Sequence, residues 1–198
     1  DVYDSTDYKA ANYKWILKFH NNTPSPQKNF VFYDETVDPR LKFTRIDYSR
    51  LMEGNYGIGK QIHTIVKRII LTMEDGSIKE IQSEADKDGN GLIDLTKYGT
   101  VVGWRMEMKD DFVLQSGQGI NLNSYTSFKD PEKTRYDETD ATKNVYKNTG
   151  RVTYKTQSNV AKDQSADWTF KLIPMKESFE IAKRTDYNDV RYTDGQNI

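Results

Sequence analysis

Apolar and polar residues alternate with a period of two through most of this chain. In "YKWILKF", residues 13–19, aromatic and aliphatic side chains occupy the odd positions, and lysines occupy two of the three even positions. Residues 30–34 ("FVFYD") and 41–46 ("LKFTRI") repeat the theme. This period places one apolar row on one face of an extended backbone, so each segment is predicted to be a half-buried β-strand.

Residues 62–73, "IHTIVKRIILTM", are ambiguous, because their apolar positions also trace one face of a helix. The Ile and Val residues in the later part favour an extended backbone. Asp75-Gly76 follows as a turn signal and leads into alternating Ile78 and Ile81. Residues 69–81 are therefore predicted to form a β-hairpin.

The second half of the chain continues the alternation in residues 101–108, 150–156 and 167–173. Some eight to ten short strands, separated by Gly, Pro, Asn and Asp clusters, predict an all-β protein built as an antiparallel β-sandwich with long surface loops. Residues 127–148 form a polar excursion, which predicts a surface loop with a helical turn. Trp15, Trp104 and Trp168 lie at alternating positions among apolar neighbours, so we expect them to pack in the core.

The composition narrows the classes of partner that the protein is expected to bind. The 29 basic and 30 acidic residues are spread along the 198-residue chain and give a net charge of −1, which leaves no electrostatic footprint for nucleic acid or anionic lipid. No apolar run approaches the roughly 20 residues that span a bilayer, so membrane insertion is not expected. Cysteine is absent, which removes thiol nucleophiles, thiolate metal sites and disulfides.

The stretch "DKDGNGLIDLTK", residues 86–97, resembles a calcium-binding loop up to its last position. Such loops use oxygen ligands at alternating positions and a glycine at position 6, which Gly91 provides. Lys97 stands where the bidentate glutamate belongs, and strands rather than helices are predicted on both sides. Calcium is expected to bind through side-chain oxygens and one carbonyl, from Asp86, Asp88, Asn90, Leu92 and Asp94. The alternative is a turn, which Asp, Asn and Gly also favour.

Two parts of the sequence resemble a known family. "YKWILKFHNN" followed by "QKNFVFYDET" is similar to the opening of Ig-like adhesin and stalk repeat domains of Gram-positive cell-wall-anchored surface proteins, and "NTGRVTY" resembles a strand near the end of such domains. The opening pattern is carried by Trp15, Ile16, Asn21, Asn29, Phe30, Phe32 and Asp34. The resemblance implies an Ig-like β-sandwich that lies outside the cell, anchored to the cell wall through regions beyond this chain, and serves adhesion or spacing.

The resemblance also implies an internal isopeptide bond. In that family an early-strand lysine joins a late-strand Asn or Asp with the help of a buried carboxylate, and burial supplies the neutral amine by lowering the lysine pKa. The residues carried over are Lys14 or Lys18 with Asn144 or Asn148. Both lysines lie on the face of their strand opposite Trp15, so two solvated lysines are the alternative.

No catalytic motif accompanies the two histidines, His20 and His63, so no enzyme is predicted. The alternative function is a carbohydrate-active enzyme or its sugar-binding accessory domain. The 30 acidic residues offer many carboxylate pairs that could hydrolyse a glycoside, and only their spatial arrangement would identify a catalytic one. Exposed aromatic rings could stack on a sugar or contact a partner. The candidates for such contacts, in polar later segments, are Tyr125, Tyr136 and Tyr146.

The two ends of the chain resemble each other. The matching residues are Asp1, Asp4, Tyr8 and Asn12 at one end and Asp186, Asp189, Tyr192 and Asn197 at the other. This predicts a single β-sandwich module over residues 1–185 and the start of a next tandem repeat over 186–198. The expected partners are a host extracellular protein or glycan and adjacent repeats of the same chain. A structural repeat of a surface layer is a further reading.

Overall fold

A computed structural model describes residues 2–4, 12–49, 65–81 and 91–173 of the chain. The predicted start of a next repeat, residues 186–198, and His63 lie outside the described residues. The described strands are β1 (Val2–Asp4), β2 (Tyr13–His20), β3 (Gln27–Val37), β4 (Leu41–Asp47), β5 (Val66–Met73), β6 (Ile78–Ile81), β7 (Leu92–Asp94), β8 (Val101–Met108), β9 (Val113–Leu114), β10 (Gly119–Phe128), β11 (Val145–Thr156) and β12 (Ala161–Ile173).

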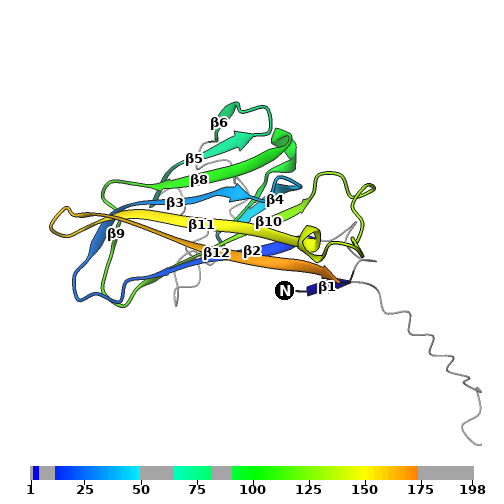
Figure 1. The fold of residues 1–198 in the computed structure, drawn as a ribbon. Coiled ribbons are helices and arrows are strands. Elements are labelled where there is room, and N and C mark those ends of the chain that lie inside the picture. Colours follow the sequence, from blue (N-terminus) through cyan, green and yellow to red (C-terminus); the bar gives the residue numbers. More distant parts are fainter. Residues whose placement is uncertain (1, 5–11, 50–64, 82–90, 174–198) are drawn as a thin grey trace, which may run out of the picture.

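The strands form the predicted antiparallel β-sandwich (Figure 1). One layer runs β12-β11-β3-β8-β5-β6, and the other runs β7-β4-β10-β2. The layers join where β8 meets β4, because these two strands share a single registered pair, Phe43 with Val101. Among the described strands the exception to antiparallel pairing is β1, which runs parallel to the last three residues of β12.

The predicted hairpin over residues 69–81 is confirmed, and so is the strand assigned to the later part of residues 62–73. Ile69 pairs with Ile81 and Thr72 with Ile78. Gly76 at the turn has φ of +80°, a left-handed conformation that glycine adopts without the steric cost of a Cβ. Asp75 closes the turn, since its carboxylate accepts hydrogen bonds from the Ser77 backbone and hydroxyl groups.

The core between the layers consists of two apolar clusters. The larger cluster includes Phe30, Phe32 and Trp104, all fully buried. The smaller cluster lies toward the end of the sandwich where β1 pairs with β12, and it gathers Tyr13, Trp15, Leu41, Phe128, Tyr146, Phe170 and Leu172. The two clusters are the physical result of the period of two, because each strand presents its apolar row to the opposite layer.

Aromatic rings join β2 to strands with which it shares no backbone ladder. Tyr13 stacks on Phe170 of β12 with ring centroids 4.1 Å apart, and Phe19 meets Tyr154 of β11 edge to face at 5.0 Å. The described backbone partner of β2 is β10. β2 therefore packs face to face against the β11–β12 pair, and it forms the border of the second layer, beside β12 along the lower side of the molecule in Figure 1.

The expectation for the tryptophans is correct for two of the three. Trp15 and Trp104 are buried, as predicted. Trp168 is 64% exposed, so its expected place in the core is wrong. Trp168 shares a strand face with the buried Phe170, but no described residue of the opposite layer covers the face at that point.

The polar excursion of residues 127–148 is shorter than predicted, because β10 continues to Phe128 and β11 begins at Val145. The helical turn is present as a 3₁₀ helix, Ala141–Asn144, capped by the carboxylate of Asp140, which accepts from the Thr142 backbone N–H. A second 3₁₀ turn, Thr96–Tyr98, leads into β8. Within the described ranges no helix is long and apolar enough to cross a membrane.

Candidate functional site

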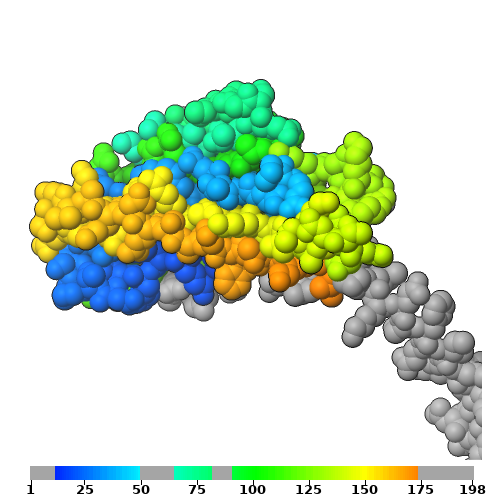
Figure 2. Space-filling model, viewed as in Figure 1, coloured from blue at the N-terminus to red at the C-terminus, as the bar shows by residue number. Residues whose placement is uncertain are grey.

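A groove of about 610 Å³ runs along the border where β2 and β12 face each other. Consecutive residues of both strands line it, 14–19 from β2 and 164–168 from β12. Gly150, Arg151 and Val152 of β11 also contribute to the lining. The groove therefore lies between β2 of one layer and the β11–β12 pair of the other. Figure 2 shows β11 and β12, in yellow and orange, lying directly above the blue β2.

Three polar side chains lie at the inner end of this groove. Asp34 of β3 is buried, and its Oδ2 accepts a hydrogen bond of 2.6 Å from the Ser124 hydroxyl of β10. Asn148 of β11 is also buried, and both Asp34 and Asn148 line the groove. Asp34 Oδ1 and Asn148 Oδ1 are buried without a regular hydrogen-bond partner among the described residues. A buried oxygen without a hydrogen-bond partner lowers the stability of the folded state. Asp34 and Asn148 therefore form an unusual polar site within the apolar core.

The carboxyl group of Asp34 has an unusual affinity for its proton. Burial raises the pKa of Asp34 from 3.8 to about 7, while the Ser124 hydroxyl and the nearby side chain of Asn148 act against the rise. Burial dominates because the ionised form loses its hydration and gains no cation in return. A carboxyl with a pKa near neutrality can give and take a proton under physiological conditions, so Asp34 is suited to assist a proton transfer.

The outer rim of the groove is basic. Lys14 and Lys18 of β2 are exposed and line the groove, and neither forms an ion pair with a described residue. Across the gap, Asp167 of β12 is paired with Lys147 at 2.7 Å and Asp163 with Arg151 at 2.7 Å. The uncompensated charge on the rim is therefore positive.

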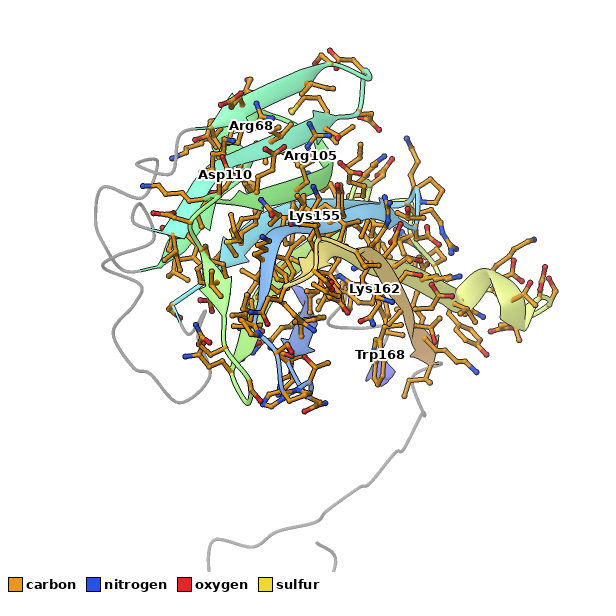
Figure 3. The ribbon with its side chains drawn as sticks, turned by 90° about the vertical axis from the view of Figure 1, so that its left-hand side faces the viewer. Arg68, Arg105, Asp110, Lys155, Lys162 and Trp168 are labelled. Carbon is orange, nitrogen blue, oxygen red and sulfur yellow. The ribbon has the colours of Figure 1, made fainter. Side chains whose placement is uncertain are left out.

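The rim is also apolar at two points. Ile16 of β2 is 54% exposed, and Trp168 of β12 stands on the other wall. Figure 3 shows Trp168 projecting from β12 on the opposite side of the molecule from Arg68 and Arg105. An exposed tryptophan beside an exposed isoleucine is a typical anchor for a binding partner.

The residues expected for an isopeptide bond differ in their surroundings: Lys14 and Lys18 are exposed, on the face of β2 opposite the buried Trp15, whereas Asn148 is buried. Lys14, Lys18 and Asn148 line the same groove, and Asp34 supplies a buried carboxyl group beside Asn148. Asn144 lies elsewhere, in the 128–145 connection. Its Oδ1 accepts from the Asp137 backbone N–H, and its Nδ2 donates to the Asp137 carbonyl, both at 2.8 Å. Asn144 thus holds its loop together, and of the two asparagines only Asn148 lines the groove.

The predicted calcium loop is described only from Gly91 onward, because Asp86, Asp88 and Asn90 lie outside the described residues. The Asp94 carboxylate accepts from the Thr96 backbone N–H at 2.9 Å and from the Thr96 hydroxyl at 2.6 Å. These bonds lower the pKa of Asp94 and close a local turn between Asp94 and Thr96. In the part of the chain that the structure describes, no cluster of three or more His, Asp or Glu side chains could hold a metal ion.

The three tyrosines expected as exposed contacts have different surroundings. Tyr146 is 2% exposed and stacks on Phe170, so the expectation of exposure is wrong for it. Its ring faces the core because Tyr146 lies on the same face of β11 as Asn148. Tyr125 is half-buried under the Arg45 guanidinium, 3.9 Å from its ring centroid. Tyr136 is half-buried against the smaller apolar cluster.

Sequence reasoning assigned no chemical role to Asp34 and placed Trp168 in the core. A signal for Asp34 is present in "FVFYD", since the acid occupies the same alternating positions as Phe30 and Phe32 and must therefore face inward. His20 hydrogen-bonds Asn22 Oδ1 at 2.7 Å on the surface, which gives it a local structural role.

No protein-family model matches the chain, and no curated protein does. Solved structures of similar architecture include the collagen-binding subdomain of the Enterococcus faecalis surface protein ACE, with 11% identity and a TM-score of 0.38 over 80% of this chain and 86% of that one. The Bacillus cereus major pilin subunit BcpA is also similar, with 15% identity and a TM-score of 0.38 over 83% of this chain and 35% of the pilin. These neighbours are Gram-positive surface adhesin and pilin domains. At such low identity and TM-score, the function proposed below rests on the chain's own residues.

Proposed function

We propose that this chain is a non-enzymatic extracellular module of a Gram-positive surface protein, and that it binds a host protein in the groove between β2 and β12. The observation that carries the proposal is the groove itself, whose walls bear the exposed side chains of Trp168 and Ile16. Exposed aromatic and aliphatic residues beside a deep groove provide contact area and a place for it to be buried. The motif resemblance of residues 13–34 to adhesin domains supports the extracellular location.

A stalk role is the second candidate, and the buried pair of Asp34 and Asn148 favours it. An isopeptide bond from Lys14 or Lys18 to Asn148 would tie β2 of one layer to β11 of the other. Such a bond stabilises the folded state by restricting the unfolded chain, in the way that a disulfide does. A spacer in a surface protein benefits from this bond without any ligand.

Binding of the full chain to immobilised collagen, other extracellular-matrix proteins and a glycan panel tests the adhesive role. We expect saturable binding to at least one matrix protein, and we expect Trp168→Ala to weaken it. Ile78→Ala is the matched control, because Ile78 is 68% exposed on β6, at the far edge of the layer that carries Trp168. If Ile78→Ala weakens binding as much as Trp168→Ala, or if neither does, the groove is not the binding site.

Failure to bind any matrix protein or glycan leaves the stalk role, provided that the crosslink is found by mass spectrometry. Glycan binding accompanied by hydrolysis of the bound glycan contradicts both roles and favours the carbohydrate-active alternative.

A further inference from the structure

A second hollow lies at the end of the sandwich where β11 turns into β12, which is the left-hand end in Figure 1. It has a volume of about 460 Å³, and it is bounded by the β2–β3 connection and by the β11–β12 hairpin. None of its described lining residues belongs to the groove, and Lys162 in the hollow is six residues, or about 20 Å, from Trp168 along β12. Its polar side chains include those of Thr23, Ser25, Gln27, Thr156, Ser158 and Lys162.

Hydrogen bonds hold both walls of the hollow in place. On the β2–β3 side, the buried Asn21 accepts from the Thr23 backbone N–H at 3.0 Å and from its hydroxyl at 2.7 Å, and it donates to the Ser25 carbonyl at 3.0 Å. On the hairpin side, the Thr156 hydroxyl accepts from the Val160 backbone N–H at 3.1 Å. Because the walls are already ordered, a ligand binds there with little further cost in side-chain entropy.

Gln27 contributes an acceptor that lacks a donor. Gln27 is 4% exposed and lines the hollow, yet its Oε1 has no hydrogen-bond partner among the described residues. Its Nε2 donates to the Thr23 hydroxyl oxygen over a long distance of 3.4 Å. A buried amide oxygen without a donor lowers stability, and the terminal torsion of a glutamine side chain turns over a broad range of angles. After such a turn, a ligand hydroxyl in the hollow would supply the missing donor.

Three lysines, Lys28, Lys155 and Lys162, surround the hollow and are called the rim lysines below. Lys162 lines the hollow itself, whereas Lys28 and Lys155 adjoin lining residues in the chain and lie directly opposite each other in the β3–β11 ladder. None of the three forms an ion pair with a described residue. Like charges directly opposite on neighbouring strands repel, so an anionic ligand at this rim would relieve a repulsion. Figure 3 views the molecule from this end and labels Lys155 and Lys162.

We propose that the hollow binds a sugar unit of an acidic polysaccharide, with ring hydroxyls bonded to Gln27 and to the serine and threonine side chains, and with carboxylates paired to the rim lysines. Sugar hydroxyls donate and accept hydrogen bonds, as serine and threonine hydroxyls do, so the two sets match. Small-ligand pockets have volumes of about 300–1,000 Å³, and this hollow lies within that range. Because the site is separate from the groove, this inference goes beyond the host-protein binding proposed above.

The test follows the backbone amide signals of the isotope-labelled full chain by NMR, during titration with a tetrasaccharide that alternates glucuronic acid with N-acetylglucosamine. We expect saturable shifts at Thr23, Thr156 and Val160, which line the hollow, and smaller shifts at Trp168. A neutral tetramer of N-acetylglucosamine has ring hydroxyls without carboxylates, and a tetraglutamate peptide has carboxylates without ring hydroxyls. Each should bind roughly tenfold more weakly, because it lacks one of the two sets of bonds.

Variants of the chain assign the binding to the hollow. Lys162→Gln should weaken binding of the acidic tetrasaccharide by roughly tenfold, because it removes the ammonium group that lines the hollow. Lys14→Gln removes the same charge from an exposed lysine of the groove, and this matched control should bind as the wild type does. Gln27→Met keeps the length of the side chain but removes its amide, and it should also weaken binding. Circular dichroism melts check that the variants fold.

Three results overturn the proposal: no saturable shift at about 10 mM tetrasaccharide, which would saturate a site with a millimolar dissociation constant, shifts centred on Trp168, or equal binding by Lys162→Gln. Equal binding of the neutral tetramer also overturns it, and equal binding of tetraglutamate would assign the rim lysines to an acidic peptide instead. Trp168→Ala should leave saccharide binding unchanged while it weakens matrix-protein binding, so failure of this proposal can be told from failure of the adhesive role.

Discussion

Trp168 and Phe170 lie two residues apart on the same face of β12, yet Trp168 is 64% exposed and Phe170 is 3% exposed. Phe170 is covered because Tyr13 stacks on it at 4.1 Å and Tyr146 at 4.9 Å. Trp168 stands where the layers separate into the groove. The boundary between the core and the groove therefore falls between these two residues.

This boundary predicts opposite effects on stability. Phe170→Ala removes a ring from the centre of an aromatic stack, and it should lower the free energy of unfolding by about 3–5 kcal/mol. Trp168→Ala should change it by less than about 1 kcal/mol, because an exposed ring loses little burial. Urea unfolding of both variants measures the difference. Equal losses would show that Trp168 packs in the core after all.

The buried carboxyl of Asp34 predicts a pH dependence of stability. Its pKa is about 7 in the folded protein and 3.8 in the unfolded chain, so between these values the folded state holds a proton that the unfolded state releases. The stability that Asp34 contributes is therefore full below pH 3.8, falls as the pH rises and is lost above about pH 7.

Asp34→Asn should remove this dependence, because the amide has the same shape and does not titrate. Between pH 5 and pH 8 the difference in stability should shift in favour of the variant by roughly 2.7 kcal/mol, because each of the two pH units between 5 and the folded pKa of about 7 contributes about 1.36 kcal/mol. Melting temperatures of both proteins across this range give the comparison. Parallel curves would mean that Asp34 ionises normally.

The isopeptide prediction concerns a defined reaction. The Nζ lone pair of Lys14 or Lys18 attacks Cγ of Asn148, a C–N bond forms, the Cγ–Nδ2 bond breaks and ammonia leaves. Asp34 can take the proton from the amine and give it to the departing nitrogen. The intact protein should then weigh one ammonia less than its sequence mass.

Asn148→Ala and Asp34→Asn should each restore the full sequence mass, and tandem mass spectrometry of the digested wild type should identify the bonded lysine. Asn144→Ala is the control and should keep the crosslink, because Asn144 bonds Asp137 instead. A wild type of full sequence mass contradicts the crosslink, and a bond to another lysine contradicts the choice of Lys14 or Lys18.

Gly91 predicts a stability loss that needs no calcium. Its φ is +78°, and a Cβ there would come within 2.4 Å of the Ser49 Cα. Gly91→Ala should therefore destabilise the protein by more than about 1 kcal/mol even in chelator. Gly117 has the same φ but open space around it, so Gly117→Ala should cost less. Equal losses in urea unfolding would show that the close approach to Ser49 is relieved easily.

Calcium binding at residues 86–97 remains a prediction. If calcium binds only the folded state, an excess of a hundred times its dissociation constant should add about 2.7 kcal/mol to the free energy of unfolding. The melting temperature should rise with calcium, fall back in chelator and show no gain in Asp88→Ala. Magnesium serves as the control ion, and a melt that ignores calcium would identify the stretch as a turn.

The sequence reveals the strands well because the period of two is a local property. It identifies which face of β12 carries Trp168 and Phe170, but it cannot show where the opposite layer ends, and that decides which ring is covered. Asp34 and Asn148 meet because β3 and β11 pair within one layer, a relationship between distant segments that no local pattern encodes. The groove has the same origin, since it lies between the first long strand and the last one.

The parallel pairing of β1 with β12 determines how the folded chain would respond to tension. Val2 pairs with Lys171 and Asp4 with Ile173, so the chain enters β1 and leaves β12 at opposite ends of this short ladder. A pull on the chain before Val2 and after Ile173 slides the two strands past each other. The ladder's hydrogen bonds are then loaded together in shear, instead of being opened one after another as they are when a hairpin is unzipped.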